Sequence, residues 1–433
     1  MNQLNFLKSL FCFEGVFVVW IFSYQFKNAL SFNNSIDITL LLTCLLVPWA
    51  FVIIFKDKLK LKIQKSIFKE VPFLFILWSI WSLFSYLWAP THFYGTQKTL
   101  CYFLYTFSGF LIAYYVIGKT FSRIKRFLMS IAIFGFFIHL WILMDFWRYG
   151  ISFREFLGTN YLVTGETLGA AFLIFFVYSL NGFLKIKASL SKIFQEKKLL
   201  IREIFLLVGA TTLLYVSFNL GGRGPVLALG IALFCLYVLN MLYRPSLLLW
   251  SHVLLFSLIF MGLFYGFNHF FHYQGLPLFI ERTPFVLKDP VNVLSSDLNI
   301  TLRLEYYISA FKMFLAHPLQ GGGFGAWSLF DNFSATALHP HNIFLEILSE
   351  TGLIGFFLFI SMLYQSLKGI HLKSIIKNPL GISLFLLLIF GFINALKTGD
   401  LNDNIFFLTL IALMARLPRQ KLSYNKRFLK EQV

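Results

Sequence analysis

Twelve long apolar runs divide the chain, and each has the composition of a helix that crosses a membrane. They lie near residues 9–26, 38–55, 71–88, 100–118, 127–147, 167–184, 199–219, 224–243, 246–267, 342–366, 378–396 and 404–416. The runs are continuous rather than alternating, which favours helices over the strands of a membrane barrel. A spanning helix needs ~20 mostly apolar residues, so the pattern predicts an all-α, polytopic membrane protein with about 12 transmembrane helices.

Polar residues between the runs predict which side of the membrane each connection faces. Placing the N-terminus in the cytoplasm puts 27 of the 37 Lys and Arg side chains on that side. Because cytoplasmic connections carry the excess of Lys and Arg, we expect both termini to be cytoplasmic. The connection from 268 to 341 then lies outside, and a loop of that length is more often functional than a passive link.

The predicted outer loop contains a second apolar pattern, this one at helical spacing. Residues 301–316 (TLRLEYYISAFKMFLA) place apolar side chains three or four positions apart: Leu304, Tyr307, Ile308, Phe311 and Leu315. The stripe predicts a short amphipathic helix on the outer membrane surface, ended by Pro318. The next residues, HPLQGGGFG at 317–325, have the Pro and Gly content of a tight turn that must approach another segment closely.

Composition supports the membrane location and changes the meaning of the charge. The 433 residues are 58% hydrophobic and 13% charged, whereas soluble domains are close to half apolar and one quarter charged. A net charge of +18 is also typical of nucleic-acid binders. Here the basic residues follow the membrane topology, so we interpret them as orientation signals that meet anionic lipid headgroups and expect no nucleic acid partner.

Neither separate domains nor a cysteine framework is indicated. The four cysteines all lie in predicted spans without CxxC spacing, so disulfides and a thiolate metal site are not expected. No internal repeat or flexible linker interrupts the sequence. We therefore expect residues 1–433 to form a single membrane domain, with residues 268–341 as a periplasmic elaboration between the ninth and tenth spans.

Two arginines are candidates for binding phosphate. Arg223 lies in NLGGRGPVLALG, on the side where the orientation rule disfavours a base, and the adjacent glycines let the backbone approach a ligand. Guanidinium offers planar, bidentate donors suited to phosphate. Arg303, near the start of the predicted surface helix, would face a lipid phosphate at the same depth. The alternatives are that Arg223 extends to lipid headgroups and that Arg303 pairs with Glu305.

His339 and His341 are candidates for acid–base chemistry and substrate contact. They flank Pro340 and directly precede an apolar run. Neutral imidazole can take a proton from an attacking sugar hydroxyl, whereas the alternative is a pair that only forms hydrogen bonds at the membrane surface. A zinc site with His269 and His272 is a further alternative. The carboxylate or cysteine ligands that zinc needs are not clustered here, so we expect no metal.

Two acids follow the histidines in the same run. Glu346 and Glu350 come five and nine residues after His341. Glu350 precedes the Thr351-Gly352 break, which makes it the better partner for orienting a histidine or a polar substrate. Either acid can instead cap or solvate a helix end, so Glu350 is a substrate-binding candidate and neither acid is assigned a catalytic role.

The order of these motifs resembles the O-antigen ligase and O-antigen polymerase superfamily. GGRGPVLAL is followed by Arg303 at the head of a helix, then by HPLQGGGFG and by HPHNIFLEILSETGLIG at 339–355. Ligases of that superfamily show a histidine separated by ten residues from a glycine, and His341 and Gly352 have this spacing. The resemblance covers residues 219–357, and one departure is Gly222, where the family often has serine.

The resemblance implies a metal-independent glycosyltransferase at the periplasmic face of the bacterial inner membrane, without a cofactor. Its donor would be a glycan on undecaprenyl pyrophosphate. Arg223 and Arg303 would bind the pyrophosphate, and His341 would activate the acceptor hydroxyl. On physical grounds, fixed cationic donors stabilise a multiply charged leaving group as its charge develops, so two arginines can take the place of a metal ion.

Three functions remain open on the sequence. A ligase would join lipid-linked polysaccharide to lipid A-core, whereas a polymerase would use a second lipid-linked repeat unit as acceptor. The two share their donor chemistry, and the histidine–glycine spacing favours the ligase. A transporter or flippase is the alternative from another class. Transporters typically show internal repeats and polar groups at the membrane midplane, whereas the informative residues here gather at one face.

Overall fold

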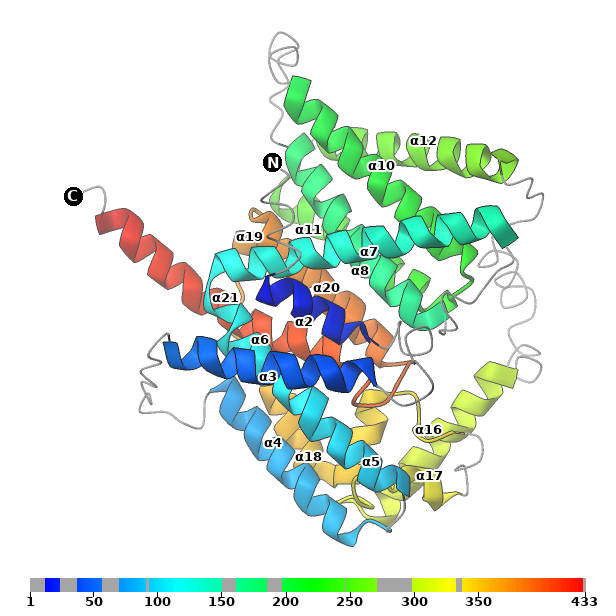
Figure 1. Ribbon diagram of the computed structural model, residues 1–433, viewed down its shortest axis with the longest axis vertical. Helices are drawn as coiled ribbons and strands as arrows, with labels where there is room; N and C mark the ends of the chain where they lie inside the picture. Colours follow the sequence, from blue (N-terminus) through cyan, green and yellow to red (C-terminus); the bar gives the residue numbers. More distant parts are fainter. Residues whose placement is uncertain are drawn as a thin grey trace. The chain divides into compact units, whose positions relative to one another are not determined.

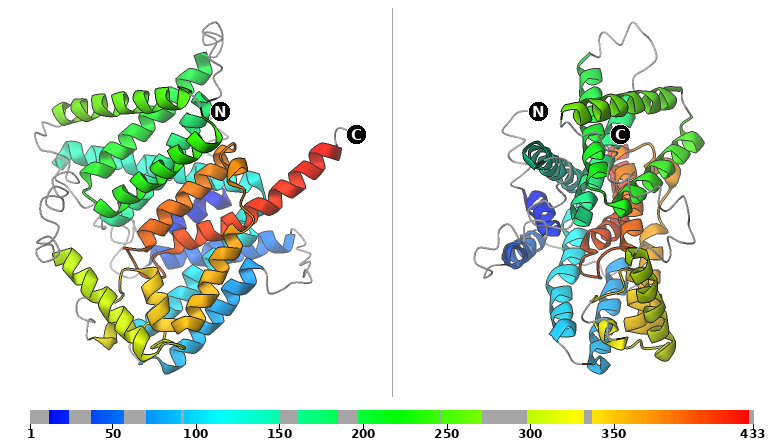
Figure 2. Two further views of the ribbon diagram at one scale, coloured as in Figure 1. Left: turned by 180° about the vertical axis from the view of Figure 1, so that it is seen from behind. Right: turned by 90° about the vertical axis from the view of Figure 1, so that its right-hand side faces the viewer.

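The computed structural model describes residues 12–23, 37–56, 70–90, 93–149, 161–184, 197–245, 247–270, 298–331 and 337–430. These residues form helices joined by turns and contain no strand. The prediction of an all-α protein is therefore confirmed for the described part of the chain. Figures 1 and 2 show the helices from three directions.

The helices are named as in Figure 1. They are α2 (Phe13–Ile21), α3 (Ile38–Lys56), α4 (Val71–Ser85), α5 (Phe93–Cys101), α6 (Ser108–Tyr115), α7 (Phe121–Tyr149), α8 (Tyr161–Phe183), α10 (Lys197–Asn219), α11 (Arg223–Tyr243), α12 (Leu247–Phe270), α16 (Leu298–Ala316), α17 (Trp327–Phe330), α18 (Ile343–Leu367), α19 (Leu372–Ile375), α20 (Pro379–Ala395) and α21 (Ile405–Lys430). A π-helical stretch over Tyr102–Phe107 joins α5 to α6.

Nine helices in the described residues are long and apolar enough to cross a membrane. They match the eight predicted runs from 38–55 to 246–267 and the run at 342–366, which confirms a polytopic membrane protein. The runs near 378–396 and 404–416 form shorter apolar helices, Pro379–Ala395 and Ile405–Leu417. The first run is helical over Phe13–Ile21 of its described residues.

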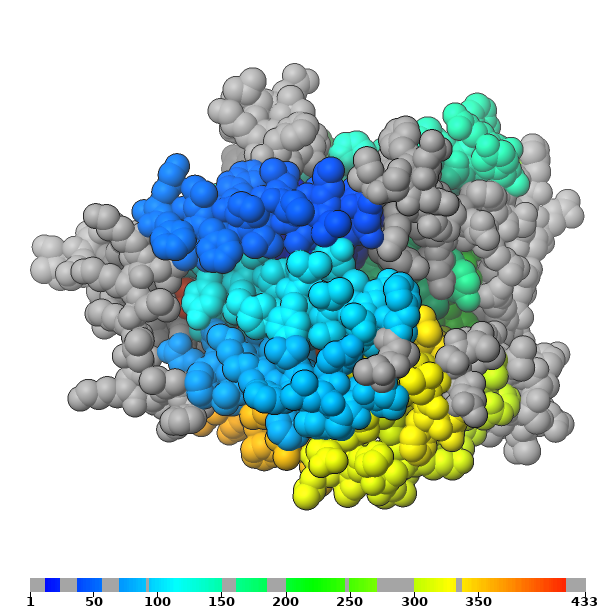
Figure 3. Space-filling model, turned by 60° about the horizontal axis from the view of Figure 1, so that its bottom comes forward, coloured from blue at the N-terminus to red at the C-terminus, as the bar shows by residue number. Residues whose placement is uncertain are grey.

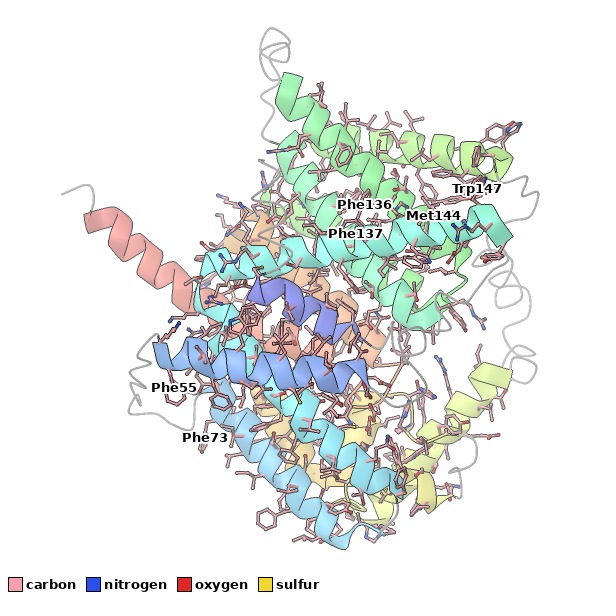
Figure 4. All side chains as sticks on the ribbon, in the orientation of Figure 1. Phe55, Phe73, Phe136, Phe137, Met144 and Trp147 are labelled. Carbon is pink, nitrogen blue, oxygen red and sulfur yellow. The ribbon has the colours of Figure 1, made fainter. Side chains whose placement is uncertain are left out.

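Large apolar side chains remain exposed on these helices. On α7, Phe137 and Met144 are about half exposed and Trp147 is 70% exposed (Figure 4). On α12, Met261 and Tyr265 are exposed as well. Exposing an apolar surface of this extent to water costs free energy, whereas exposing it to the hydrocarbon of a bilayer does not. These faces are therefore the ones that lipid covers.

The chain divides into two compact units, which alternate along the sequence. Unit 1 comprises residues 1–42, 125–288 and 371–390, and unit 2 comprises residues 43–124, 289–370 and 391–433. Arg223 belongs to unit 1. The other four site candidates, Arg303, His339, His341 and Glu350, belong to unit 2.

The centre of unit 1 is α8, which packs along α10. Small residues allow the close approach of its neighbours. A Cβ added to Gly135 of α7 would lie 2.4 Å from the Cβ of Ala171 on α8. Phe176 of α8 contacts His252 and Phe256 of α12 edge-on, with ring centroids 5.1 and 4.9 Å apart. Aromatic edges and small residues therefore fill the interior of this unit.

In unit 2, α18 is the central element because it packs against α4, α16 and α21. Trp78 of α4 contacts Phe359 of α18, with ring centroids 5.0 Å apart. The apolar first half of α21 is buried and packs against α6. Figure 3 shows one face of this unit, where α4 and α5 (blue) lie beside the segment from α16 to α17 (yellow-green and yellow).

The course of α18 is interrupted at Gly352, whose φ of 64° and ψ of −167° are not helical. The break removes the helical partners of the preceding carbonyls, and donors from other segments replace them. These are the N–H of Gly322 to Ser349 (2.9 Å), the N–H of Gly323 to Glu350 (3.0 Å) and the indole of Trp81 to Thr351 (2.8 Å). The turn predicted at 317–325 is thus confirmed, and the segment that it approaches is α18.

The helix predicted at 301–316 is confirmed as α16, with apolar side chains on two of its faces. Its Tyr306, Ala310 and Met313 are buried in a small core with Trp327 of α17. Four of the predicted stripe residues, Leu304, Ile308, Phe311 and Leu315, are 48–60% exposed on another face. The stripe therefore does not pack against the protein, and its contact with the membrane surface stays a prediction. Residues 271–297 and 332–336 of the predicted loop lie outside the described residues.

Candidate functional site

His341 directly precedes α18 in an unusual backbone conformation. Its φ is 58°, the one positive φ of a non-glycine residue in the described part of the chain. The next residue, Asn342, caps the helix: its side-chain oxygen accepts the N–H groups of Phe344 (3.0 Å) and Leu345 (3.2 Å). Histidine is one of the residues that enter the left-handed region more often than most, and such conformations cluster at functional sites.

The two histidines contact each other. Nε2 of His339 lies 3.1 Å from Nδ1 of His341, and the ring centroids are 4.4 Å apart. One of these nitrogens must carry the shared proton. When it is Nδ1 of His341, the Nε2 of that ring keeps its lone pair, and none of the described residues hydrogen-bonds to this Nε2. In that tautomer the Nε2 of His341 is available to an incoming hydroxyl.

Burial disfavours the charged form of both imidazoles. It lowers the pKa of His341 to about 4, assisted by the charge of Arg303 and by the charge that His339 carries when protonated, and opposed by Asp400. Burial also lowers the pKa of His339, which Asp400 raises and Lys98 lowers. At pH 7 the His341 imidazole is therefore unprotonated and can accept a proton, while its lowered pKa makes it a weaker base than a free imidazole.

Packing of α16 against α18 brings Arg303 into electrostatic reach of His341. The half-buried Arg303 is among the charges that act on His341. It also acts on Tyr307, whose pKa is raised by burial and lowered by the arginine. The ring of Tyr306 lies 6.1 Å from the ring of His341. The structure therefore brings together three of the candidates, Arg303, His339 and His341.

A buried ion cluster joins α5 to α18. The ammonium of Lys98 lies 2.5 Å from Oε1 of Glu346 and 2.7 Å from Oε2 of Glu350, and all three side chains are at most 1% exposed. The glutamates are four residues apart and so share one helix face. The Lys98 ammonium also lies 4.9 Å from the centre of the Phe324 ring. Glu346 Oε2 and Glu350 Oε1 accept no hydrogen bond from the described residues.

The turn between α20 and α21 lies against this cluster. Oδ1 of Asp400 accepts the N–H of Asn402 at 2.8 Å, and Oδ2 accepts the hydroxyl of Tyr94 at 3.3 Å. The Asn402 side chain donates to the carbonyl oxygen of Lys98 at 3.1 Å. Asp400 thus receives hydrogen bonds on both oxygens, and its charge acts on the two histidines.

Arg223, in unit 1, is the first residue of α11. Gly221, with a φ of 73°, turns the chain from α10 into α11, and Pro225 occupies the first turn, where its missing N–H costs nothing. The half-buried Arg223 stands at the N-terminus of α11, the positive end of the helix dipole. Both features favour a bound anion, which is the chemistry that the sequence predicted for this residue.

Lys98 is the site residue that the sequence reasoning missed. A signal was present, because this lysine adjoins an apolar run on the side where the orientation rule disfavours a base. Its partner Glu350, a substrate-binding candidate, directs its carboxylate at Lys98. His272, the remote ligand in the zinc alternative, lies outside the described residues. Among those described, no three or more His, Cys, Asp and Glu residues are grouped to hold a metal ion.

These observations define a class, a polytopic α-helical membrane protein with a histidine pair at the start of one apolar helix. Residues 206–360 match the family model described as O-Antigen ligase. The matched segment contains Arg223, Arg303, His339, His341 and Glu350, and it confirms the resemblance to the O-antigen ligase superfamily. A search of curated proteins found no match. The family match supports a membrane glycosyltransferase of ligase or polymerase type that acts on lipid-linked glycans.

Proposed function

We propose that the protein is an O-antigen ligase. It transfers a glycan from undecaprenyl pyrophosphate to a lipid A-core acceptor at the periplasmic face of the bacterial inner membrane, with both termini in the cytoplasm and without a metal ion or cofactor. The observation that carries this proposal is the His339–His341 contact, with His341 within electrostatic reach of Arg303, inside the segment that matches the family.

His341 is the proposed general base. Its Nε2 takes the proton of the acceptor hydroxyl as the hydroxyl oxygen bonds to the anomeric carbon of the donor. The bond from that carbon to the pyrophosphate oxygen breaks, and undecaprenyl pyrophosphate leaves with the electron pair. His339 accepts a hydrogen bond from Nδ1–H of the resulting imidazolium, so that it stabilises the charge that His341 gains.

Arg223 and Arg303 are the proposed ligands of the donor pyrophosphate. Their bidentate donors match phosphate oxygens, and the attraction strengthens as the leaving group gains negative charge. The proposal requires both guanidinium groups to reach one substrate. Single cysteines at 223 and 303 in an otherwise cysteine-free chain test this, because a short bifunctional thiol reagent should link them in membrane vesicles. Accessibility of the two cysteines from opposite sides of the membrane would overturn the shared site.

A polymerase is the second candidate, since it uses the same donor chemistry. The spacing from His341 to Gly352 favours the ligase, and lipopolysaccharide from a deletion strain separates the functions on a gel. Bare core with accumulated lipid-linked polymer is the result expected of a ligase. Core that carries a single repeat unit would instead assign a polymerase. A block before the glycan reaches the periplasm would assign a flippase and remove the transferase proposal.

A further inference from the structure

The first turns of α18 are held by contacts with other segments. Gly352 breaks the helix, so residues 343–351 form a short piece whose orientation the rest of α18 does not fix. His341 lies immediately before this piece and Glu346 lies five residues after His341, which is about one and a half helical turns. Any contact that fixes Glu346 and Glu350 therefore also fixes the position of the histidine pair.

Lys98 makes that contact. Its ammonium bridges Glu346 and Glu350 on successive turns of α18. The turn after α20 joins the same cluster, because the N–H of Leu401 donates to Glu346 Oε1 at 3.3 Å and Asn402 donates to the Lys98 carbonyl. One lysine thus links α5, the start of α18 and the turn that carries Asp400. A surface pair would be worth little, but a fully buried cluster has no water to replace its partners.

We propose that Lys98 is a positioning residue for glycan transfer: by bridging Glu346 and Glu350 it holds the first turns of α18, and with them His339 and His341, in the geometry that transfer needs. The proposal rests on the proposed function. In it, Glu350 acts through Lys98 and does not touch the substrate. Lys98 carries no catalytic step.

A set of variants that removes the lysine together with one or both acids separates positioning from folding. Lys98→Met alone leaves two buried carboxylates without their cation and is expected to lower the amount of folded protein. The triple variant Lys98→Met/Glu346→Gln/Glu350→Gln removes the tether and all three charges together. A second variant, Lys98→Gln/Glu346→Gln, also removes the tether but keeps the formal charge of the cluster at −1. It is tested in place of the triple variant if the triple variant does not accumulate in the membrane.

The control is an ion pair in unit 1 whose carboxylate is buried and whose arginine side chain is 42% exposed. Arg126 of α7 donates two hydrogen bonds to the carboxylate of Glu14 on α2, at 2.9 and 3.1 Å, and Glu14 is 1% exposed. The double variant Glu14→Gln/Arg126→Met removes this pair. It is expected to change stability while leaving kcat within about twofold of the wild-type value, because sites without shared partners act independently.

The expected result is a split between the kinetic constants. With a purified lipid-linked donor and acceptor, the tether variants should keep the KM for the donor near its wild-type value and lose about 100-fold in kcat, the loss that a misplacement of about 1 Å produces. A tether variant that accumulates with wild-type kcat overturns the proposal. An equal loss of kcat in the Glu14→Gln/Arg126→Met control also overturns it, because the effect would then be general.

A second readout does not depend on transfer. Diethyl pyrocarbonate modifies neutral imidazole, and mass spectrometry of the peptide that contains His341 gives its rate of modification. Loss of the tether should raise this rate several-fold, whereas the unit 1 control should not. A raised rate supports the positioning role whether or not the wild-type protein transfers glycan. Absence of transfer by the wild-type protein would reject the proposed function and leave the positioning role standing. An unchanged rate in a folded tether variant rejects the positioning role.

Discussion

Gly321 and Gly352 meet backbone to backbone, each in a conformation with positive φ. A Cβ added to Gly352 would lie 2.3 Å from the carbonyl oxygen of Leu319 and 2.5 Å from the amide nitrogen of Gly321. A Cβ added to Gly321 would lie 2.3 Å from the carbonyl oxygen of Glu350. Glycine is therefore needed at both positions where the GGGFG turn contacts the non-helical residue of α18. This contact determines the position of the first turns of α18.

Gly352→Ala should strongly destabilise the protein. The φ and ψ of this residue fall in a region that is essentially restricted to glycine, and placing alanine there costs about 1–3 kcal/mol. The added methyl group would also clash with backbone atoms, which cannot move aside as a flexible side chain can. We expect a lower melting temperature in detergent and less protein in the membrane. Gly230→Ala is the matched control: Gly230 lies within α11 with no atom within 4 Å of an added Cβ. Equal melting temperatures for the two variants would contradict the proposed cause.

His341→Ala should abolish glycan transfer while the amount of protein in the membrane stays unchanged. The residue supplies the proposed base from the turn before α18, where its side chain is half-buried rather than in the core. Transfer is measured with purified enzyme, lipid-linked donor and acceptor. Activity at the wild-type level in this assay would remove His341 from the mechanism.

The pH dependence should follow the lowered pKa of His341. Because burial lowers this pKa to about 4, the base stays neutral far below pH 6.5 and the acid limb of kcat/KM should fall near pH 4. The unfolded chain binds the proton near pH 6.5 and the folded chain only near 4. The stability that this residue contributes is therefore complete above pH 6.5 and is lost as the pH falls toward 4. An acid limb centred on pH 6.5 would show an unperturbed imidazole.

Arg223→Lys should weaken donor binding at least about tenfold, because the loss of one charge-assisted hydrogen bond costs ~1.5–3 kcal/mol and a point charge cannot reproduce a bidentate fork. The Kd for undecaprenyl pyrophosphate, measured on protein in nanodiscs, gives the effect directly. Arg244→Lys is a suitable comparison, since Arg244 binds the carbonyl of Ile376 within unit 1. Donor affinity of Arg223→Lys near the wild-type value would make Arg223 an anchor to the membrane surface.

Chelators should leave transfer unchanged. In the proposed reaction two guanidinium groups stabilise the leaving pyrophosphate, so no divalent ion takes part. The assay is run on purified enzyme after dialysis against EDTA, with and without added Mg²⁺ or Mn²⁺. Activity that disappears on dialysis and returns with either ion would show that a metal takes part.

Much of the fold follows from patterns that the sequence displays openly. Continuous apolar runs fix the helices, because backbone groups in lipid must be satisfied within the segment. The stripe in residues 301–316 and the Gly-rich turn after it also predict local structure correctly. The sequence alone does not show that Leu304 and Leu315 stay exposed while Tyr306 and Met313 are buried, because both faces of α16 are apolar.

The candidate site is only partly visible in the sequence. The histidine pair and Arg303 lie near each other in the structure, and their residue types in adjoining segments already indicate chemistry. Lys98 is separated from Glu346 by more than two hundred residues, so its role follows only from the packing of α5 against α18 and the turn before α21. Glu350 is predicted as a partner for a histidine or a polar substrate, and in the structure one of its carboxylate oxygens lies 2.7 Å from the ammonium of Lys98. Pairing across distant segments is set by tertiary structure, which no local pattern encodes.

The alternation of the chain between the two units limits how this protein can be dissected. The segment matched by the family model, residues 206–360, begins in unit 1 and passes into unit 2 at residue 289. A chimera that exchanges only this segment with a relative would place Glu346 and Glu350 opposite a foreign α5. A chimera intended to exchange donor or acceptor specificity should therefore also exchange the α4–α5 region. Glu346 and Glu350 then stay with the lysine of their own protein.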